Sequence, residues 1–427
     1  LQKNADLGVF QGVHWSHAGP FWASDSPYVV SYNVCGVKPS NPKPKVVVIG
    51  AGATGRGHVG LLAWQAGAHV VFADANEGLV HALQQAGAYR VDIHDGKTCR
   101  QVVVRGADYL AAAQREAVSR HLADADLALT AVFDQNLPDV ALTVALAARR
   151  CREAGRTRPL NFIACENMQN SSSTLGRHVR DALTGEDLDY CLRYFGFPDC
   201  MISRVVPQPE GDPLVITAED YNEWTARRQD FKGQSPAWLT ALELVDNQDA
   251  RLERKLFMHN GGHAICGYLG FHYGHSYIHE AVADPRVARC VAAACDQLGE
   301  VVRRKHGFPA PALEEYKHDL YRRGAIPEMR DQILRVVRQP LRKLGAQERL
   351  VAPARLAFQY GLPRGQIVRG IVAALKYQHP GDPQSLEMQR AIQQQGLPGL
   401  LSKVSRLAPG EPLLAEIEEA WAAWRLE

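Results

Sequence analysis

The chain has 427 residues, of which 46% are hydrophobic and 22% are charged, and its formal net charge is +2 at pH 7. The length suits about two or three globular domains. The near-neutral charge excludes a strongly basic nucleic-acid binder and an acidic tail, and no apolar run approaches the ~18 residues that a membrane-spanning helix needs.

Cysteine usage and the first residues bear on the compartment. Nine cysteines are scattered without a CxxC pair, which favours reduced thiols over a disulfide framework. Residues 1–5 contain no apolar signal-peptide core. We therefore expect a cytoplasmic protein.

Residues 1–44 are rich in Gly, Pro, Ser and aromatic residues and show no helical period. They end in a linker-like stretch, Pro39–Pro44, which cannot be helical. This segment is either a poorly packed extension or an arm on the main body. Because so many aromatic side chains are unusual for disorder, we expect an arm anchored by Trp15, Phe21 and Trp22.

From Lys45 onward the pattern is that of an α/β fold. Val46–Ile49 is a short apolar run, typical of a buried parallel strand. A glycine turn and a helix over 57–66 follow. Further strands are expected at His69–Asp74, Ala125–Val132 and Leu160–Ala164. Strands that alternate with helices predict a doubly wound, Rossmann-type sheet over residues 45–235.

Beyond about residue 235 the strand patterns stop and helical periods dominate. This change predicts a mostly α-helical second domain over residues 236–427. Its expected helices are Arg286–His306, Met329–Lys343, Gln366–Tyr377, Pro383–Gln394 and Pro412–Arg425.

The turn after the first strand contains Gly50, Gly52 and Gly55 in GxGxxG spacing, between an apolar strand and a helix. The first glycine permits a tight turn, the second lets a pyrophosphate approach the backbone, and the third lets the helix pack closely. The neighbouring Arg56 and Asn76 complete the predicted cofactor site. The alternative is a glycine turn that binds nothing.

Asp74 ends the second strand, 24 residues after Gly50. A carboxylate there can accept hydrogen bonds from the adenosine ribose hydroxyls, and it repels a 2′-phosphate. No Arg or Lys follows in residues 75–79 to bind such a phosphate. We therefore predict NAD rather than NADP.

A second constellation lies in residues 253–263, which contain Lys255, Asn260 and His263. These groups can move a proton on and off a hydroxyl and hold a developing oxyanion. On an unbroken helix Asn260 lies ~140° around from Lys255 and His263 lies ~80° around, so one broad face can present all three. The alternative is that Gly261-Gly262 interrupts the helix there. Asn167 follows a predicted strand of the first domain, where doubly wound folds place ligand-facing residues. Taken singly, each residue has a structural alternative: a solvated charge, a turn former or a satisfied histidine.

Histidine spacing raises the possibility of zinc. Two pairs have the i, i+4 spacing of helical zinc ligands. However, there is no HExxH motif and no cysteine pair with ligand spacing, so we predict no metal. The histidines concerned are His259, His263, His272, His275 and His279.

From about Lys45 to its end, the chain resembles the polyol-specific long-chain dehydrogenases, the mannitol-1-phosphate 5-dehydrogenases among them. The motifs are numerous and appear in the family's order. They are Gly50–Gly52 with Gly55–Gly57, Phe72–Asp74, Cys165–Met168, Phe231–Gly233, Glu253–Phe257, Asn260 with Gly262–Ala264, Tyr268–Gly270 and Arg338–Leu344.

The resemblance implies a metal-independent, NAD-linked oxidoreductase. By motif position, Lys255 matches the general acid/base, and Asn167 and Asn260 match the carboxamides that bind the reacting oxygen. His263 matches the residue that holds the substrate hydroxyl. Members of the family are often monomers, so we expect a monomer or weak homo-oligomer that acts on a small molecule, without nucleic acid or membrane.

The chain departs from the family at positions expected to form pocket walls. Where the family commonly has Arg-Phe-x-Asn-Pro, this chain has Ile326 in place of a polar group. A less polar wall suits a shorter, cyclic or less hydroxylated substrate. Arg204, Arg323 and Lys343 are candidates to bind a substrate phosphate.

Three functions compete. The first is interconversion of a polyol phosphate, such as mannitol 1-phosphate, and its ketose phosphate by hydride transfer. The second keeps the chemistry but uses a free polyol or a specialised ketone or aldehyde. The third is a non-catalytic dinucleotide sensor, which has no need of the lysine, asparagines and histidine.

Overall fold

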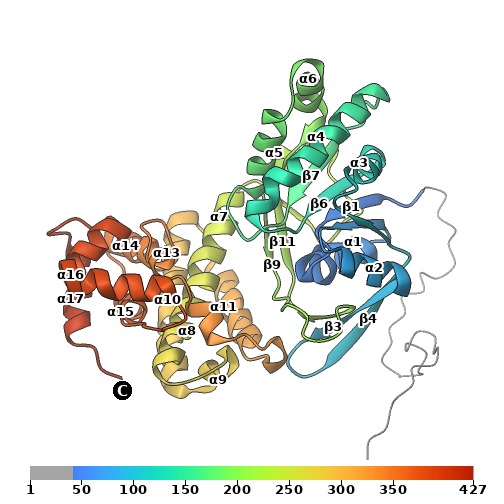
Figure 1. Cartoon of the computed structure of the whole chain (residues 1–427). Coiled ribbons are helices and arrows are strands. Elements are labelled where there is room, and N and C mark those ends of the chain that lie inside the picture. Colours follow the sequence, from blue (N-terminus) through green and yellow to red (C-terminus); the bar gives the residue numbers. More distant parts are fainter. Residues whose placement is uncertain (1–41, 427) are drawn as a thin grey trace, which may run out of the picture.

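The computed structural model describes residues 42–426 as a sheet-containing domain beside a helical one (Figure 1). The predicted arm over residues 1–44 therefore lies outside the described residues, apart from its last three. Within the described range, no helix has both the length and the apolar content to cross a bilayer.

Six strands form the central sheet, in the order β5-β2-β1-β6-β7-β8, and all neighbouring pairs are parallel. The predicted apolar run becomes β1, in which Val46 and Val48 face one core while Val47 and Ile49 face the other. A strand covered on both faces needs this continuous apolar pattern. The strands are β1 (Lys45–Ile49), β2 (His69–Asp74), β5 (Asp108–Ala111), β6 (Leu127–Thr130), β7 (Leu160–Ala164) and β8 (Phe195–Gly196).

Helices cover both faces of this sheet, which confirms the predicted doubly wound domain. One face packs against α3 (Arg115–Asp124), α4 (Leu137–Glu153), α5 (Ser171–Asp181) and α6 (Gly185–Tyr194). The other packs against η1 (Gly55–Val59), α1 (Gly60–Gln65) and α2 (Glu77–Ala86). A short 3₁₀ turn, η2 (Asp134–Asn136), precedes α4.

Two small sheets extend this domain, and none of their strands was predicted. Their strands are short or alternate in burial, so they lack the continuous apolar run that marks β1. One sheet joins β10 (Val215–Glu219), β3 (Ala88–His94) and β4 (Cys99–Arg105). The other joins β12 (Glu243–Val245), β11 (Glu223–Arg227) and β9 (Cys200–Ser203), with η3 (Arg228–Asp230) after β11. The strand β12 lies beyond residue 235, where no strand was expected.

The rest of the described chain is helical, as predicted. Its core surrounds α8, whose residues are buried nearly all round. The elements are α7 (Gln248–Arg254), η4 (Lys255–Gly261), α8 (Gly262–His272), α9 (Ile278–Ala283), α10 (Pro285–His306), α11 (Ala310–Gly324), η5 (Pro327–Met329), α12 (Ile333–Val337), α13 (Pro340–Lys343), α14 (Val351–Gln359), α15 (Gly365–Leu375), α16 (Pro383–Ser405) and α17 (Pro412–Ala422).

Two helix predictions were wrong in their extent. The helix expected over Met329–Lys343 is split into α12 and α13, because Pro340 lacks a backbone N–H and the preceding Gln339 has φ +60°. The helix expected over Pro383–Gln394 continues to Ser405, with a kink at Gly396, where φ is +73°. Glycine takes this conformation without a steric penalty.

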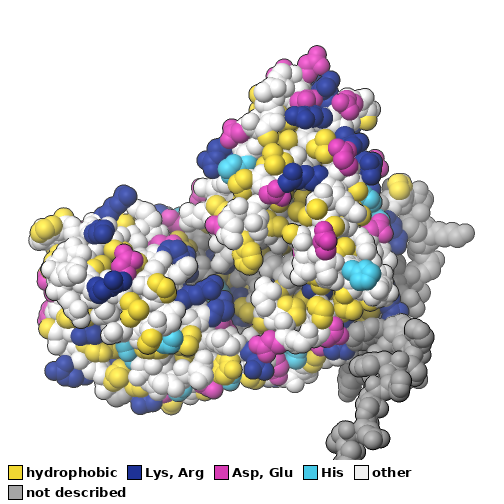
Figure 2. Space-filling model, in the orientation of Figure 1, with side chains coloured by type: hydrophobic (Ala, Val, Ile, Leu, Met, Phe, Trp, Pro, Cys, Tyr) yellow, Lys and Arg dark blue, Asp and Glu magenta, His cyan; other side chains and the backbone are white. Residues whose placement is uncertain are grey.

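Buried ion pairs join the two domains. The guanidinium of Arg323 on α11 lies 2.6 Å from Glu219 of β10, and both side chains are inaccessible to water. Arg254 of α7 pairs with Glu223 of β11. The surface dips between the two domains beside this junction (Figure 2). The carboxyl ends of the parallel strands and the first turn of the helical domain meet in the same region.

Candidate active site

The glycine turn has the geometry that the sequence predicts. Gly50 has φ +105°, and a Cβ there would collide with the carbonyl oxygen of Ala131. A Cβ on Gly55 would collide with the carbonyl oxygen of Gly50. By contrast, a Cβ on Gly52 would meet no atom within 4 Å. The fold itself requires the first and third glycines, whereas the second faces open space of the kind a pyrophosphate needs.

Asp74 and Asn76 lie beside this turn. The Asp74 carboxylate accepts hydrogen bonds from the backbone N–H of Ala51 (2.6 Å) and of Asn76 (2.8 Å). Asn76 is the N-cap of α2, where its side chain accepts from Leu79 N–H at 3.0 Å. The carboxylate keeps lone pairs for ribose hydroxyls. These residues fit a dinucleotide.

Arg56 has a different place from the other predicted cofactor residues. Its guanidinium is buried and donates to the carbonyl oxygens of Ala51 (2.6 Å) and Pro213 (2.7 Å). Burial lowers its pKa. Arg56 therefore holds the glycine turn from the inside, and its charge is not directed at the space in front of Gly52.

The segment with Lys255 forms a wide π-helical turn, η4, inside an otherwise continuous helix. Such a turn bonds residue i to i+5 and adds one residue to the helix. The extra residue sets the following side chains back by about 100°. Asn260 then lies within about 40° of the direction of Lys255, and His263 within about 20°, instead of the ~140° and ~80° of a regular helix.

Lys255 reaches across the domain junction. Its Nζ donates to the backbone carbonyl of Ile202 at 2.7 Å and to Oδ1 of Asn167 at 3.3 Å. The structure thus brings together two residues that the sequence places in separate domains. Burial, with the nearby charge of Arg323, lowers the pKa of Lys255 to about 8.

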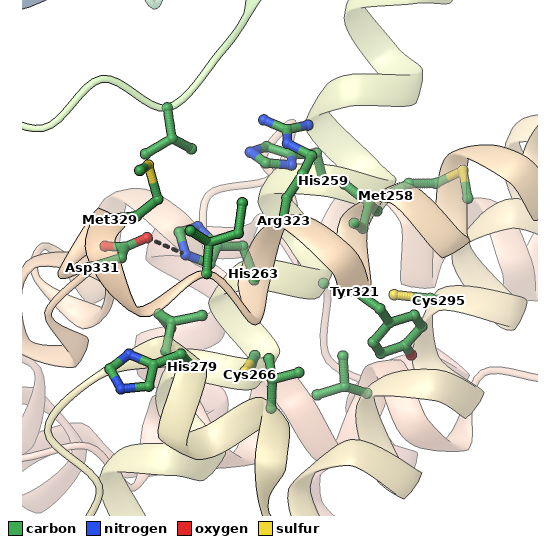
Figure 3. A pocket seen from close by; sticks show the side chains of 18 residues that line it. Met258, His259, His263, Cys266, His279, Cys295, Tyr321, Arg323, Met329 and Asp331 are labelled. Carbon is green, nitrogen blue, oxygen red and sulfur yellow. Dashed lines mark ion pairs between the residues drawn. The ribbon is translucent and has the colours of Figure 1, made fainter. Parts of the chain in front are cut away.

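His263 has a fixed partner in Asp331. Its Nε2 lies 2.8 Å from Asp331 Oδ2, and Figure 3 shows the pair at the edge of a pocket. Burial favours the neutral carboxyl, but the adjacent His263 and Arg335 outweigh it and hold the pKa of Asp331 at about 2. An ionised Asp331 therefore orients the imidazole. The next ring, His259, has a pKa well below its ordinary value because of burial and the charge of Arg323.

The structure does not gather the three cations proposed for a substrate phosphate. Arg323 is engaged with Glu219, and Lys343 donates to the carbonyl of Arg338. Arg204 donates to backbone carbonyls, including that of Glu219 at 2.9 Å. Burial, with the charge of nearby arginines, lowers the pKa of Lys343 to about 7. All three side chains are directed at groups of the protein itself.

Sequence reasoning missed some residues near the site. Glu166, next to Asn167, accepts from Thr130 Oγ1 (2.8 Å) and Val132 N–H (3.0 Å), and burial raises its pKa to about 7. Its place at the end of a predicted strand was a usable signal. Asp331 and Glu219 had no such signal, since only the tertiary fold brings them to their partners.

The five histidines considered for zinc do not all converge: His259, His263 and His279 line one cavity, and the other two lie elsewhere. His275 pairs with Asp284, and His272 contacts the carbonyl of Ala373, so they belong to different surroundings from His263. Over residues 42–426, no three His, Cys, Asp or Glu side chains are placed to share a metal ion.

The fold and the glycine turn define a two-domain protein of the dinucleotide-binding class. Residues 44–240 match the model of the mannitol dehydrogenase Rossmann domain, and residues 249–424 match that of the mannitol dehydrogenase C-terminal domain. The chain belongs to the mannitol dehydrogenase family.

Two solved structures have a similar fold. A D-sorbitol dehydrogenase in substrate-free form has 18% identity and a TM-score of 0.75, over 89% of this chain and 93% of its own. The mannitol 2-dehydrogenase of Pseudomonas fluorescens, in complex with NAD and D-mannitol, has 18% identity and a TM-score of 0.68, over 89% of this chain and 92% of its own. At this identity the likeness concerns the fold alone.

Proposed function

We propose that this protein is an NAD-dependent dehydrogenase of a non-phosphorylated polyol or a related secondary alcohol, interconverting it with the ketone. The observation that carries the proposal is the contact of Lys255 with Asn167, which unites a proton-transfer group with the carboxyl end of the nucleotide-binding sheet. Bound NAD supplies the hydride acceptor for oxidation and, when reduced, the hydride donor for the reverse reaction.

The residues of the chain carry out the remaining steps. With a pKa near 8, Lys255 is partly neutral at physiological pH, so its Nζ can take the hydroxyl proton of the substrate. Asn167 and Asn260 donate amide N–H groups to the oxygen as it gains negative charge. His263, oriented by Asp331, holds the same hydroxyl. In oxidation the C–H hydrogen leaves as hydride and the O–H hydrogen leaves as a proton to Lys255.

Two observations favour a free substrate over a phosphorylated one. The cations of Arg204, Arg323 and Lys343 are directed at protein partners. In addition, the solved relatives named above are a sorbitol and a mannitol 2-dehydrogenase. The earlier interpretation as a polyol-phosphate enzyme is therefore the weaker one.

A substrate and cofactor panel tests the proposal. Purified protein is assayed at 340 nm with D-mannitol, D-sorbitol, D-fructose and short hydroxyketones, each beside its phosphate ester where one exists, with NAD(H) and NADP(H). We expect turnover of unphosphorylated compounds with NAD(H) preferred. A consistent preference for phosphate esters would restore the first interpretation, and the absence of all turnover would reject a dehydrogenase role.

A further inference from the structure

A cavity of about 70 Å³ lies next to His263, lined mainly by the helical domain and on one side by Val205 of the sheet-containing domain (Figure 3). It is bounded by residues of η4, α8, α9, α10 and α11 and by those around η5. A water-sized group occupies roughly 10–15 Å³ on this measure. The cavity therefore has room for about five such groups, the size of a short carbon chain.

One end of this cavity is polar, but its polar groups are already engaged. His263 and Asp331 pair with each other, and Arg323 pairs with Glu219. This end is also the one nearest Lys255 and Asn260, the residues proposed to act on the substrate oxygen. His263 follows Asn260 by one helical turn, and burial, with the charge of Arg323, lowers the pKa of Lys255. A substrate held by His263 thus extends from there into the cavity.

Most of the remaining lining is apolar, although His259, His279 and Tyr321 also border the cavity. The apolar walls include Cys266, Ile278, Val282, Val291, Leu320 and Ile326. Ile326 is 2% exposed, so the position that departs from the family's polar pattern is a buried wall of this cavity.

Among the lining residues, the rings of His259 and His279 and the hydroxyl of Tyr321 remain to bind hydroxyls here. The buried hydroxyl of Tyr321 has no hydrogen-bond partner within residues 42–426 and can take one polar atom. His279 Nδ1 has no hydrogen-bond partner among the described residues and offers a place for one polar atom. Each further hydroxyl without a partner weakens binding roughly tenfold. By contrast, each buried methylene strengthens binding about fourfold.

We propose that this cavity binds an apolar tail of the substrate. The preferred substrate class is then a hydroxyketone, or the corresponding vicinal diol, with an aliphatic segment of about three to five carbons next to the reacting carbon, and not a fully hydroxylated sugar alcohol. This inference rests on the proposed dehydrogenase function for the reaction, but the binding of the tail can be tested without turnover.

Matched substrates test the tail. The kcat/KM with NADH is measured for hydroxyacetone, 1-hydroxyhexan-2-one and D-fructose, which present a hydroxymethyl ketone with no tail, an apolar tail and a polar tail. We expect 1-hydroxyhexan-2-one to exceed hydroxyacetone by roughly sixtyfold, about fourfold for each of three added methylenes, and to exceed fructose. A higher value for fructose than for 1-hydroxyhexan-2-one would overturn the inference while leaving the dehydrogenase role intact.

A binding experiment tests the tail site independently of turnover. Thermal stabilisation of the full-length protein by hexane-1,2-diol is compared with that by glycerol and by D-mannitol. Stabilisation by the hexanediol at concentrations where the other two have no effect supports the tail site, even if no substrate is turned over. Equal effects of all three compounds would reject it.

Variants locate the tail. Val282→Phe fills the cavity, so we expect the advantage of 1-hydroxyhexan-2-one over hydroxyacetone to fall at least tenfold while hydroxyacetone turnover changes by less than about threefold. The control is Ala283→Leu, an exposed position on the same helix. Ile326→Asn is a second variant, expected to shift preference toward fructose. An undiminished chain-length advantage in folded Val282→Phe protein would mean that the tail lies elsewhere.

Discussion

Two wide π-helical turns, η1 and η4, place different parts of the chain at the site. The glycine turn that leads into η1, from Gly50 to Gly55, presents backbone groups. Its glycines let main-chain atoms lie close to one another and face open space. The turn at Lys255–Gly261 presents side chains, because its extra residue aligns Lys255 with Asn260 and His263. Changes in the first turn should therefore affect folding and cofactor binding, whereas changes in the second should affect proton transfer.

The largest expected effect comes from the second turn. Lys255→Ala removes the proposed proton acceptor, so kcat/KM should fall by about 10³-fold, within the range for general acid–base catalysis. The affinity for NADH, followed by fluorescence titration, should change little. Lys317→Ala, which removes a surface lysine on α11, serves as the control. A Lys255→Ala enzyme with near-normal kcat/KM would show that proton transfer uses another group.

The first turn offers a matched pair of substitutions. Gly52→Ala should leave the melting temperature nearly unchanged, because its Cβ meets no protein atom, but it should weaken NAD binding by roughly tenfold or more by occupying the place of the pyrophosphate. Gly50→Ala should destabilise the fold by about 1–3 kcal/mol, since φ is +105° and the Cβ collides with Ala131. Calorimetry and titration with NAD check both. Equal effects of the two variants on stability would remove the distinction between them.

The orientation of His263 is the next test. Asp331→Asn removes the ionised partner of the imidazole, and we expect kcat/KM to fall about tenfold with little loss of folding stability. Asp319→Asn, on the neighbouring surface of α11, is the control. If Asp331→Asn retained full activity, the ion pair would have only a structural role.

The smallest effect is the dependence of the rate on pH. Burial lowers the pKa of Lys255 to about 8, so the neutral base gains population as pH rises through 8. Alcohol oxidation should therefore rise up to tenfold per pH unit below that value and level off above it. Ketone reduction needs the protonated amine and should decline above the same pH. Measuring the pH dependence of kcat/KM for both oxidation and reduction checks this. An unchanged pH profile in Lys255→Ala protein would assign the titration to another group.

The two turns also differ in how far they could be predicted. Gly50, Gly52 and Gly55 are recognisable because each has a local steric reason that shows as a spacing in the sequence. The sequence allowed one broad helix face to present Lys255, Asn260 and His263. Their closer alignment in η4 could not be predicted, because no residue type specifies a π-turn.

The same contrast holds for the rest of the molecule. The buried strands β1 and β7 were predictable from continuous apolar runs, whereas β3 and β4 alternate in burial and were missed. Arg323 was read as a phosphate ligand because its buried partner Glu219 is recognisable only after folding. A charge in a sequence does not reveal whether it is already neutralised by a distant residue.

The Arg323–Glu219 pair also limits how the two domains can move. Removing one partner of a buried ion pair typically costs about 3–5 kcal/mol, so separating the domains at this point is expensive. We therefore expect a motion that admits NAD or substrate to keep α11 and β10 in contact. The two domains would then separate only at a distance from the Arg323–Glu219 pair, where they stay joined.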